Sequence, residues 1–114
     1  MYIKLYMSDN LYNMVEHPAK LVVEAVGTFF FLSVILHSLN DSTIGPFGVA
    51  TALLAVIYFG NSVSGAHFNP AVTFAMVTEN RIPIAVGILY VAAQLIGAFG
   101  AVKFNHLVLK NKTF

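Results

Sequence analysis

The middle of the chain reads Ser64-Gly65-Ala66-His67-Phe68-Asn69-Pro70-Ala71-Val72-Thr73. Asn69 followed by Pro70 marks the start of a helix, because Asn is a preferred N-cap and Pro suits the first helical position. A helix from Pro70 to about Thr78 is roughly 13 Å long at about 1.5 Å per residue. That length is close to half of the ~30 Å hydrocarbon core of a bilayer. The stretch therefore predicts a helix that is too short to span a membrane.

The residues just before this helix, 64–68, are poor helix formers placed between apolar segments. Non-helical backbone at membrane depth survives only where protein buries it or where it lines a water-filled cavity. The pattern thus predicts a re-entrant half-helix whose N-terminus ends near the membrane midplane. Its dipole places a charge of about +0.5 there, and the Asn69 amide adds hydrogen-bond donors. Such a point repels cations and binds the oxygen of a neutral solute. A plain loop turn before the next helix is the alternative that composition alone leaves open.

Three longer apolar runs surround the half-helix, namely Ala19–Leu39, Phe47–Val63 and Ile82–Val102. They contain about 21, 17 and 21 residues, and a spanning helix needs about 20. Turn-forming residues 40–46 separate the first run from the second. The runs therefore predict an all-α membrane protein with three transmembrane helices and one half-helix.

The composition agrees with a membrane protein. Hydrophobic residues make up 58% of the 114 residues, and only 10% are Asp, Glu, Lys or Arg, whereas a soluble domain carries about 25% charged residues. The mean hydropathy of +0.78 excludes a disordered chain and argues against a soluble enzyme. The net charge of +1 provides no basic face for nucleic acid, and the absence of cysteine excludes disulfides and thiolate chemistry.

We therefore expect an integral, multi-pass membrane protein with one membrane domain, in a membrane that the sequence does not identify. A polar N-terminal segment (1–17) precedes this domain (18–103), and a polar, basic tail (104–114) follows it. The N-terminal segment lacks the order of basic, apolar and small residues that a signal peptide has.

The ten residues 64–73 resemble the first signature of the aquaporin and aquaglyceroporin family, also called the major intrinsic proteins. The similarity extends to Glu24–Phe29, which resembles the first helix of the family, and to Tyr90–Ala98, which resembles the third. It covers about residues 18–103. The resemblance implies the N-terminal half of an aquaporin fold, with three transmembrane helices and one re-entrant Asn-Pro-Ala half-helix.

The resemblance also implies roles for residues of the half-helix and its loop. Six of them are expected to line the pore and bind the solute: Gly65, Ala66, His67, Asn69, Pro70 and Ala71. The Asn69 amide would donate to the solute oxygen, and the backbone carbonyls of the loop residues would accept from the solute. Val49, found by counting back from Asn69 without gaps, would line the outer constriction and make it wider and less polar.

Two polar residues inside the spanning runs are expected to hold the loop in place. A carboxylate within a membrane span marks a functional site by default, and Glu24 lies inside the first run. The resemblance implies that Glu24 accepts hydrogen bonds from the backbone of Ser64–His67, and that Gln94 supports the same loop. The alternatives are a proton relay at Glu24 and an ordinary interhelical hydrogen bond at Gln94. The remaining histidines, His17, His37 and His106, show no ligand spacing, so we expect no metal site.

The chain departs from the family pattern because it contains only the first half. Family members resemble two inverted halves, and the second half carries an Arg directly after Asn-Pro-Ala, where this chain has Val72. Three helices and one half-helix cannot enclose a pore, and a loop that faced lipid would leave costly unsatisfied backbone groups. We therefore expect a partner half, supplied either by a second copy in the opposite orientation or by a separately encoded chain.

The basic residues bear on the orientation in the membrane. In the family's topology one side holds Lys4, Lys20 and Arg81, and the other side holds Lys103, Lys110 and Lys112. The positive-inside bias is therefore close to zero. A balanced distribution permits both orientations, which an inverted homodimer requires, although so few charges also balance by chance.

Together these inferences predict a subunit of a passive membrane channel for water and small neutral solutes such as glycerol. No catalysed reaction and no cofactor are expected, so the chain is not expected to be an enzyme. The expected partners are the lipid bilayer, the solute and the second half, and a higher oligomer stays open. Two other functions remain as alternatives. One is a non-conducting membrane protein or truncated fragment that pairs with a full-length relative, and the other is a small proton-coupled transporter that uses Glu24.

Overall fold

The computed structural model describes residues 2–110, which form five helices and no β-strand. The helices are α1 (Tyr2–Glu16), α2 (Ala19–Ser38), α3 (Gly45–Ser64), α4 (Pro70–Thr78) and α5 (Ile84–Leu109). By length and composition α2, α3 and α5 can each cross a membrane. The helix α4 has nine residues and cannot. The prediction of three spanning helices and one half-helix is confirmed.

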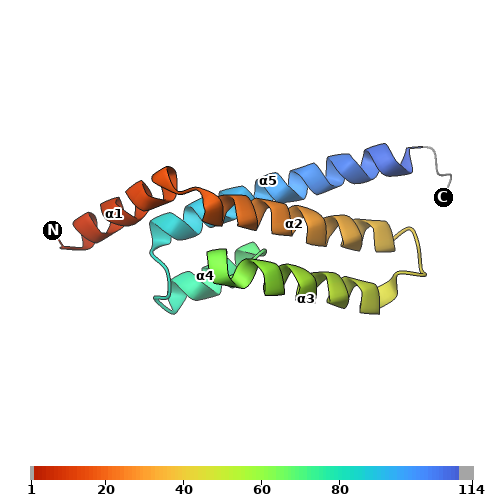
Figure 1. Ribbon diagram of the computed structural model, residues 1–114, viewed down its shortest axis with the longest axis horizontal. Helices are drawn as coiled ribbons and strands as arrows, with labels where there is room; N and C mark the ends of the chain where they lie inside the picture. The colour runs from red at the N-terminus through yellow and green to blue at the C-terminus, as the bar shows by residue number, and fades with distance from the viewer. Residues whose placement is uncertain (1, 111–114) are drawn as a thin grey trace.

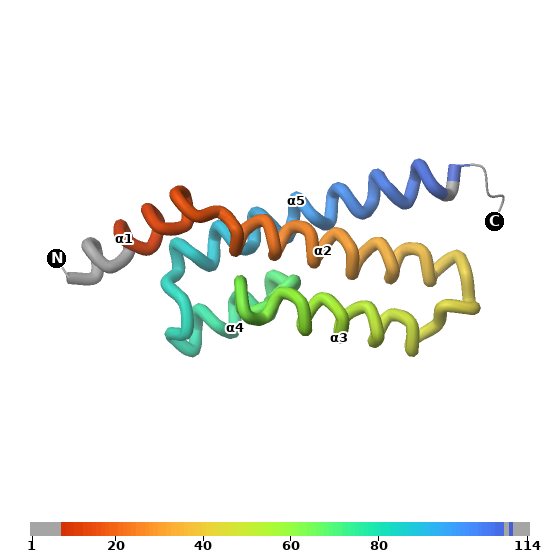
Figure 2. The backbone as a smooth tube through the Cα atoms, in the orientation of Figure 1, coloured from red at the N-terminus to blue at the C-terminus, as the bar shows by residue number. Residues whose placement is uncertain are grey.

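The three spanning helices run along the long axis of a molecule that measures 58 × 24 × 20 Å (Figure 1). The helices α2 and α5 run in the same direction, and α3 runs in the opposite one. In Figure 2 the chain reverses after α3, so that α4 runs back toward the end of the bundle at which α2 begins. Among the described helices, α2 packs against α3 and α5, whereas α4 packs against α5 alone. The half-helix thus returns to the side from which its loop entered.

Small residues allow α2 and α5 to come close together. A Cβ atom added at Gly97 would lie 2.3 Å from the carbonyl oxygen of Ala25, so this position has room for glycine only. Ala93 and Ala101, one turn to either side of Gly97, are buried. The stripe Ala93-Gly97-Ala101 is the small-residue spacing that membrane helices use for close packing.

The N-terminal helix α1 was not expected from the sequence. Residues 2–16 contain neither Gly nor Pro, so nothing in the segment itself breaks a helix. Pro18 then separates α1 from α2. Met14 of α1 is buried against Val86 and Tyr90 of α5. This contact explains why a polar segment with weak hydrophobic patterning is ordered next to the bundle.

The last helix extends further than its apolar run. The sequence predicts a span that ends at Val102 and a polar tail over 104–114, but α5 continues to Leu109. Asn105 is buried on this extension, and its side-chain amide donates to the carbonyl oxygen of Ser33 in α2 at 3.2 Å. A helix continues as long as backbone bonds and packing allow, so hydropathy does not locate its end. Residues 111–114, which include Lys112, lie outside the described residues.

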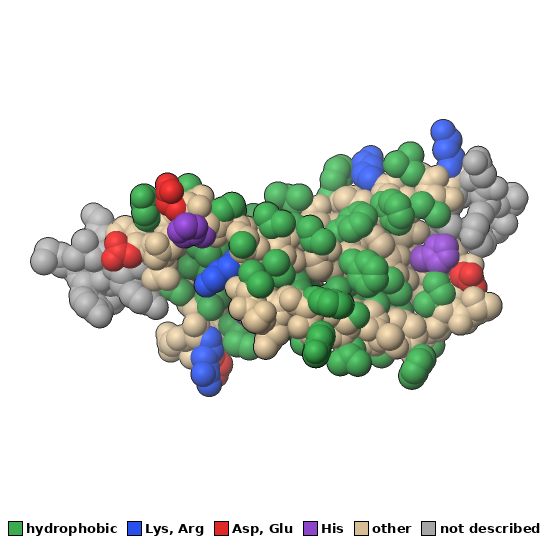
Figure 3. Space-filling view, in the orientation of Figure 1, with side chains coloured by type: hydrophobic (Ala, Val, Ile, Leu, Met, Phe, Trp, Pro, Cys, Tyr) green, Lys and Arg blue, Asp and Glu red, His purple; other side chains and the backbone are tan. Residues whose placement is uncertain are grey.

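The surface fits a membrane environment. On the face shown in Figure 3, hydrophobic side chains cover the middle of the bundle, and the Lys, Arg, Asp and Glu side chains lie toward its two ends. Lys20 and Arg81 lie near the starts of α2 and α5, and Lys110 follows the end of α5. The chain is therefore an integral, multi-pass membrane protein.

Candidate functional site

The loop between α3 and α4 has an unusual backbone. Gly65 follows α3 in the left-handed conformation with a φ of 86°, which glycine adopts without steric cost. Ala66 and Phe68 also have positive φ values, 54° and 50°. Left-handed backbone is uncommon for residues with a Cβ atom and persists where the surroundings fix it. The loop therefore depends on contacts from the rest of the molecule.

The carboxylate of Glu24 supplies most of these contacts. Glu24 is fully buried on α2. Its Oε1 accepts from the Ser64 hydroxyl at 2.7 Å and from the backbone N–H of His67 at 2.9 Å. Its Oε2 accepts from the backbone N–H of Phe68 at 2.7 Å and from the side-chain amide of Gln94 at 3.0 Å. Four protein donors therefore fill the acceptor positions that an ionised carboxylate offers.

The backbone donors differ in part from the expected range Ser64–His67. They are the N–H groups of His67 and Phe68. The N–H of Ala66 donates instead to the Ser64 hydroxyl oxygen at 3.0 Å. The carbonyl oxygen of Ser64 accepts from the Tyr90 hydroxyl at 2.6 Å. Ser64 thus links the loop to both α2 and α5.

Gln94 carries the network on to the half-helix. It is buried on α5, and its amide nitrogen also donates to the Thr73 hydroxyl at 2.8 Å. The same hydroxyl lies 2.9 Å from Nδ1 of His67, whose ring stands 4.9 Å from the ring of Tyr90. The structure therefore brings α2, the end of α3, the loop, α4 and α5 together in one buried cluster. We call it the Glu24 cluster, and it consists of Glu24, Ser64, His67, Thr73 and Gln94.

Asn69 caps α4 and is exposed, outside the Glu24 cluster. Its backbone is extended, and its Oδ1 accepts from the N–H of Ala71 at 2.8 Å. Asn69, Pro70 and Ala71 are all exposed. Among residues 2–110, the side-chain nitrogen of Asn69 has no hydrogen-bond partner. The capping bond fixes the amide so that this nitrogen remains available at the helix N-terminus.

The loop carbonyls add acceptors next to this donor. Within the described part of the chain, no donor is bound by the carbonyl oxygens of Gly65, Ala66 and His67. A donor beside a row of acceptors can bind a molecule that both donates and accepts, such as water or an alcohol. The positive end of the α4 dipole disfavours a cation at the same place. No three His, Asp or Glu side chains among residues 2–110 gather into a group that could hold a metal ion.

Val49 is not brought to the loop. It is half-buried near the N-terminal end of α3. Ser64, at the other end of the same helix, is about 22 Å away along the axis at ~1.5 Å per residue. Among the expected site residues Val49 therefore stands apart.

Three residues of the site were missed in the sequence. The Tyr90 hydroxyl binds the loop at the Ser64 carbonyl, and the Thr73 hydroxyl binds Gln94. Phe68 is buried directly before Asn69. Tyr90 and Gln94 are four residues apart, so they share one face of α5. This spacing could have indicated that both residues belong to the site. It does so only when the loop is known to contact this face of α5.

Comparisons with known proteins match the same region. The sequence model of the family described as Major intrinsic protein matches residues 20–113. Aquaporin-B from Dictyostelium discoideum is 39% identical over 84 residues, which cover 66% of this chain and 29% of that protein. Nodulin-26 from Glycine max is 37% identical over 100 residues, which cover 80% of this chain and 36% of that protein. Glycerol uptake facilitator protein-like 6 from Lactiplantibacillus plantarum is 40% identical over 88 residues, which cover 72% of this chain and 40% of that protein.

No solved structure matches the chain. The chain spans about a third of the length of the curated relatives that it matches. The matched region contains the Glu24 cluster and the Asn69-Pro70-Ala71 motif. The chain therefore belongs to the major intrinsic protein family, whose aquaporins are membrane channels and not enzymes.

Proposed function

We propose that this chain is one half of a passive membrane channel that conducts water and small neutral solutes such as glycerol. The exposed amide of Asn69, at the capped N-terminus of a half-helix and beside three unbound carbonyls, carries this proposal. The names of similar proteins, among them several aquaporins and a glycerol uptake facilitator, support the same class of solute.

The uncovered side of α4 supports a role as a half-channel. Among the described helices α4 contacts only α5, and Phe74 is 71% exposed. In the part of the chain that the structure describes, the loop before α4 contains carbonyl groups that bind no donor, and a bilayer does not tolerate such groups in contact with lipid. A second half has to cover them. We propose a second copy in the opposite orientation, with a separately encoded half as the other source.

The surroundings of Glu24 favour a supporting role over proton transport. A proton relay needs a path of donors and acceptors that leads to water. Glu24 is fully buried, and its four donors are Ser64, His67, Phe68 and Gln94, all of them occupied in holding the loop.

Proteoliposomes that contain only this chain test the channel. We expect them to swell faster than empty vesicles in an osmotic gradient and in a gradient of glycerol, without any dependence on a pH gradient. Uptake that requires a pH gradient would establish the proton-coupled transporter instead. Absence of any permeability would leave a non-conducting protein, or a half that needs a different chain.

The accessibility of a C-terminal tag in intact and permeabilised cells tests the inverted pair. We expect about half of the tags to face outside, because the flanking Lys and Arg residues are balanced. Three Lys residues added to the N-terminal segment should fix one orientation and abolish the flux. Tags confined to one side in the unmodified chain would eliminate the inverted homodimer.

A further inference from the structure

We infer that Phe68 is a positioning residue that sets the orientation of Asn69, because its ring is packed between α2 and α3. This inference rests on the proposed function, since it takes Asn69 as the group that contacts the solute. Phe68 immediately precedes Asn69 and is 3% exposed. Its left-handed backbone, with a φ of 50°, turns the chain from the loop into the extended cap of α4.

Two glycines make the space for the ring. A Cβ atom added at Gly27 of α2 would lie 2.1 Å from Cε1 of Phe68, and one added at Gly60 of α3 would lie 2.6 Å from Cζ. Neither distance is possible between real atoms, so any side chain at Gly27 or Gly60 displaces the ring. The socket of Phe68 therefore exists only because both helices carry glycine at the level of the loop.

The ring and the backbone of Phe68 are fixed together. The N–H of Phe68 donates to Oε2 of Glu24 at 2.7 Å, and the ring is enclosed by Gly27 and Gly60. A left-handed residue with a Cβ atom has few neighbouring conformations to relax into. A ring displaced further than rotation about its side-chain bonds allows therefore strains the Phe68 backbone, and Asn69 is the next residue to move.

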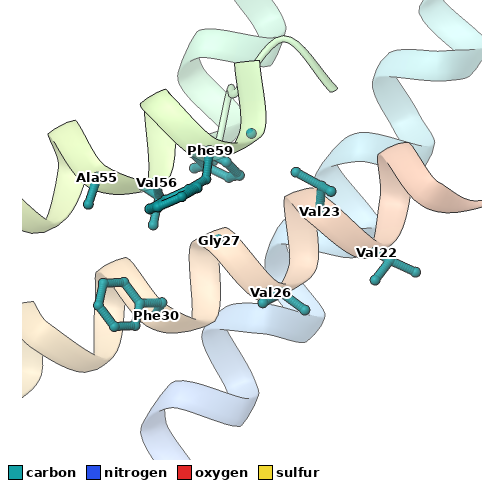
Figure 4. Close-up of a pocket in the computed structure, with 10 residues that line it drawn as sticks. Val22, Val23, Val26, Gly27, Phe30, Ala55, Val56 and Phe59 are labelled. Carbon is teal, nitrogen blue, oxygen red and sulfur yellow. The ribbon is translucent and has the colours of Figure 1, made fainter. Parts of the chain in front are cut away.

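The space around the ring determines how such a displacement proceeds. Phe68 borders an apolar groove of about 480 Å³ between α2 and α3. Figure 4 shows the two walls of this groove, with Val26 and Phe30 from α2 on one side and Val56 and Phe59 from α3 on the other. A ring pushed by a new methyl group can move into this groove while the helices stay in place. Substitutions at the glycines should therefore shift the loop and leave the bundle folded.

The contacts predict an asymmetric rescue. A Cβ at position 60 would lie 2.6 Å from Cζ of Phe68, 3.1 Å from Cγ1 of Val23 and 3.3 Å from Cε2 of Phe68, and leucine has neither of the two ring atoms. The atoms nearest a Cβ at position 27 include Cδ1, whose equivalent leucine keeps. Phe68→Leu should thus relieve Gly60→Ala and relieve Gly27→Ala only in part. A general loss of stability would produce no such difference.

The experiment compares Gly27→Ala, Gly60→Ala and Phe68→Leu in the full chain. It also includes two double variants, in which Phe68→Leu is combined with each of the glycine substitutions. The matched control is Gly100→Ala, whose new Cβ would meet only Phe29, at 3.3 Å. Water and glycerol permeability is measured in proteoliposomes per molecule of folded protein. The NMR resonances of the Asn69 side-chain amide and of the Ala71 backbone amide, which binds Asn69, are recorded in micelles as a second readout.

We expect each glycine variant to shift both resonances and to change the ratio of glycerol to water permeability per folded molecule. Gly100→Ala should leave both readouts at the wild-type values, and Phe68→Leu should restore them in Gly60→Ala more fully than in Gly27→Ala. Glycine variants that lower only the yield of folded protein, with unchanged resonances, would overturn the inference. Restoration of Gly27→Ala and Gly60→Ala to the same extent by Phe68→Leu would also overturn it. If the wild-type chain conducts nothing while the resonances shift and recover as described, the proposed channel fails and the positioning of Asn69 by Phe68 stands.

Discussion

Replacement of Glu24 by alanine should destabilise the loop and half-helix more than any other single change in the cluster. The carboxylate accepts four hydrogen bonds, but its loss does not affect the four donors equally. The Ser64 hydroxyl keeps a longer bond to the carbonyl of Gly60, at 3.4 Å, and the Gln94 amide keeps its bond to Thr73. The N–H groups of His67 and Phe68 have no other acceptor among the described residues.

The size of the effect follows from these two orphaned donors. A buried donor without a partner costs about 1–3 kcal/mol, so two of them cost about 2–6 kcal/mol. Glu24→Gln should cost about half as much, because one oxygen remains and one backbone donor is still satisfied. The new amide nitrogen would face Nε2 of Gln94, which is also a donor, so the Gln94 amide has to turn over and present its Oε1, which is buried without a partner among the described residues.

Unfolding of the purified chain in mixed micelles, followed by far-UV circular dichroism, measures both variants. Hydrogen exchange at the amides of His67 and Phe68 shows whether the loss is local. Wild-type stability in Glu24→Ala, to within about 0.5 kcal/mol, would refute the argument, because that is the usual effect of a change at an uninvolved surface site. A stable variant that has lost only a response to pH would identify Glu24 as a proton carrier.

Three further outcomes are expected. Asn69→Asp should leave the chain inserted, because Asp also caps a helix. It should abolish water flux, measured by swelling, or admit cations, measured by ion conductance in bilayers. Unchanged flux with unchanged ion exclusion would show that Asn69 does not line the pore. Mercurial reagents should not inhibit the flux through a thiol, since the chain has no cysteine; inhibition that a thiol reagent reverses would show that another protein conducts. Gly97→Ala should lower the free energy of unfolding by about 1–3 kcal/mol through overpacking, because its Cβ would meet the carbonyl oxygen of Ala25 at 2.3 Å, while Gly100→Ala stays near the wild type in the same unfolding assay.

The half-helix could be predicted because its signal is local. Asn69 as the cap and Pro70 as the first helical residue define the start of α4 from neighbouring residues alone. The three spanning helices follow from run length in the same way. Their ends were less accurate, since α5 continues past its apolar run by packing Asn105 on α2, a contact that no sequence window contains.

The contacts of the site were harder to predict because they join distant parts of the chain. The approach of Glu24 to the loop was expected only from the family resemblance, and the donors turned out to include the backbone N–H of Phe68. The bond from Tyr90 to the Ser64 carbonyl and the socket made by Gly27 and Gly60 depend on how three helices meet. Tertiary packing creates these contacts. The sequence alone does not show which aromatic ring packs against a given glycine.

The Glu24 cluster also orders the events of biosynthesis. Glu24 leaves the ribosome with the first spanning helix, and its loop partners at 64–68 follow some forty residues later. Gln94, which completes the cluster, is synthesised last, together with Tyr90, whose hydroxyl donates to the Ser64 carbonyl. Until α5 is inserted, the nascent chain holds a carboxylate and a half-helix at membrane depth with only part of their partners. The loop and α4 should therefore reach their final position late. Protection of the nascent chain from a protease should rise only once α5 has entered the bilayer.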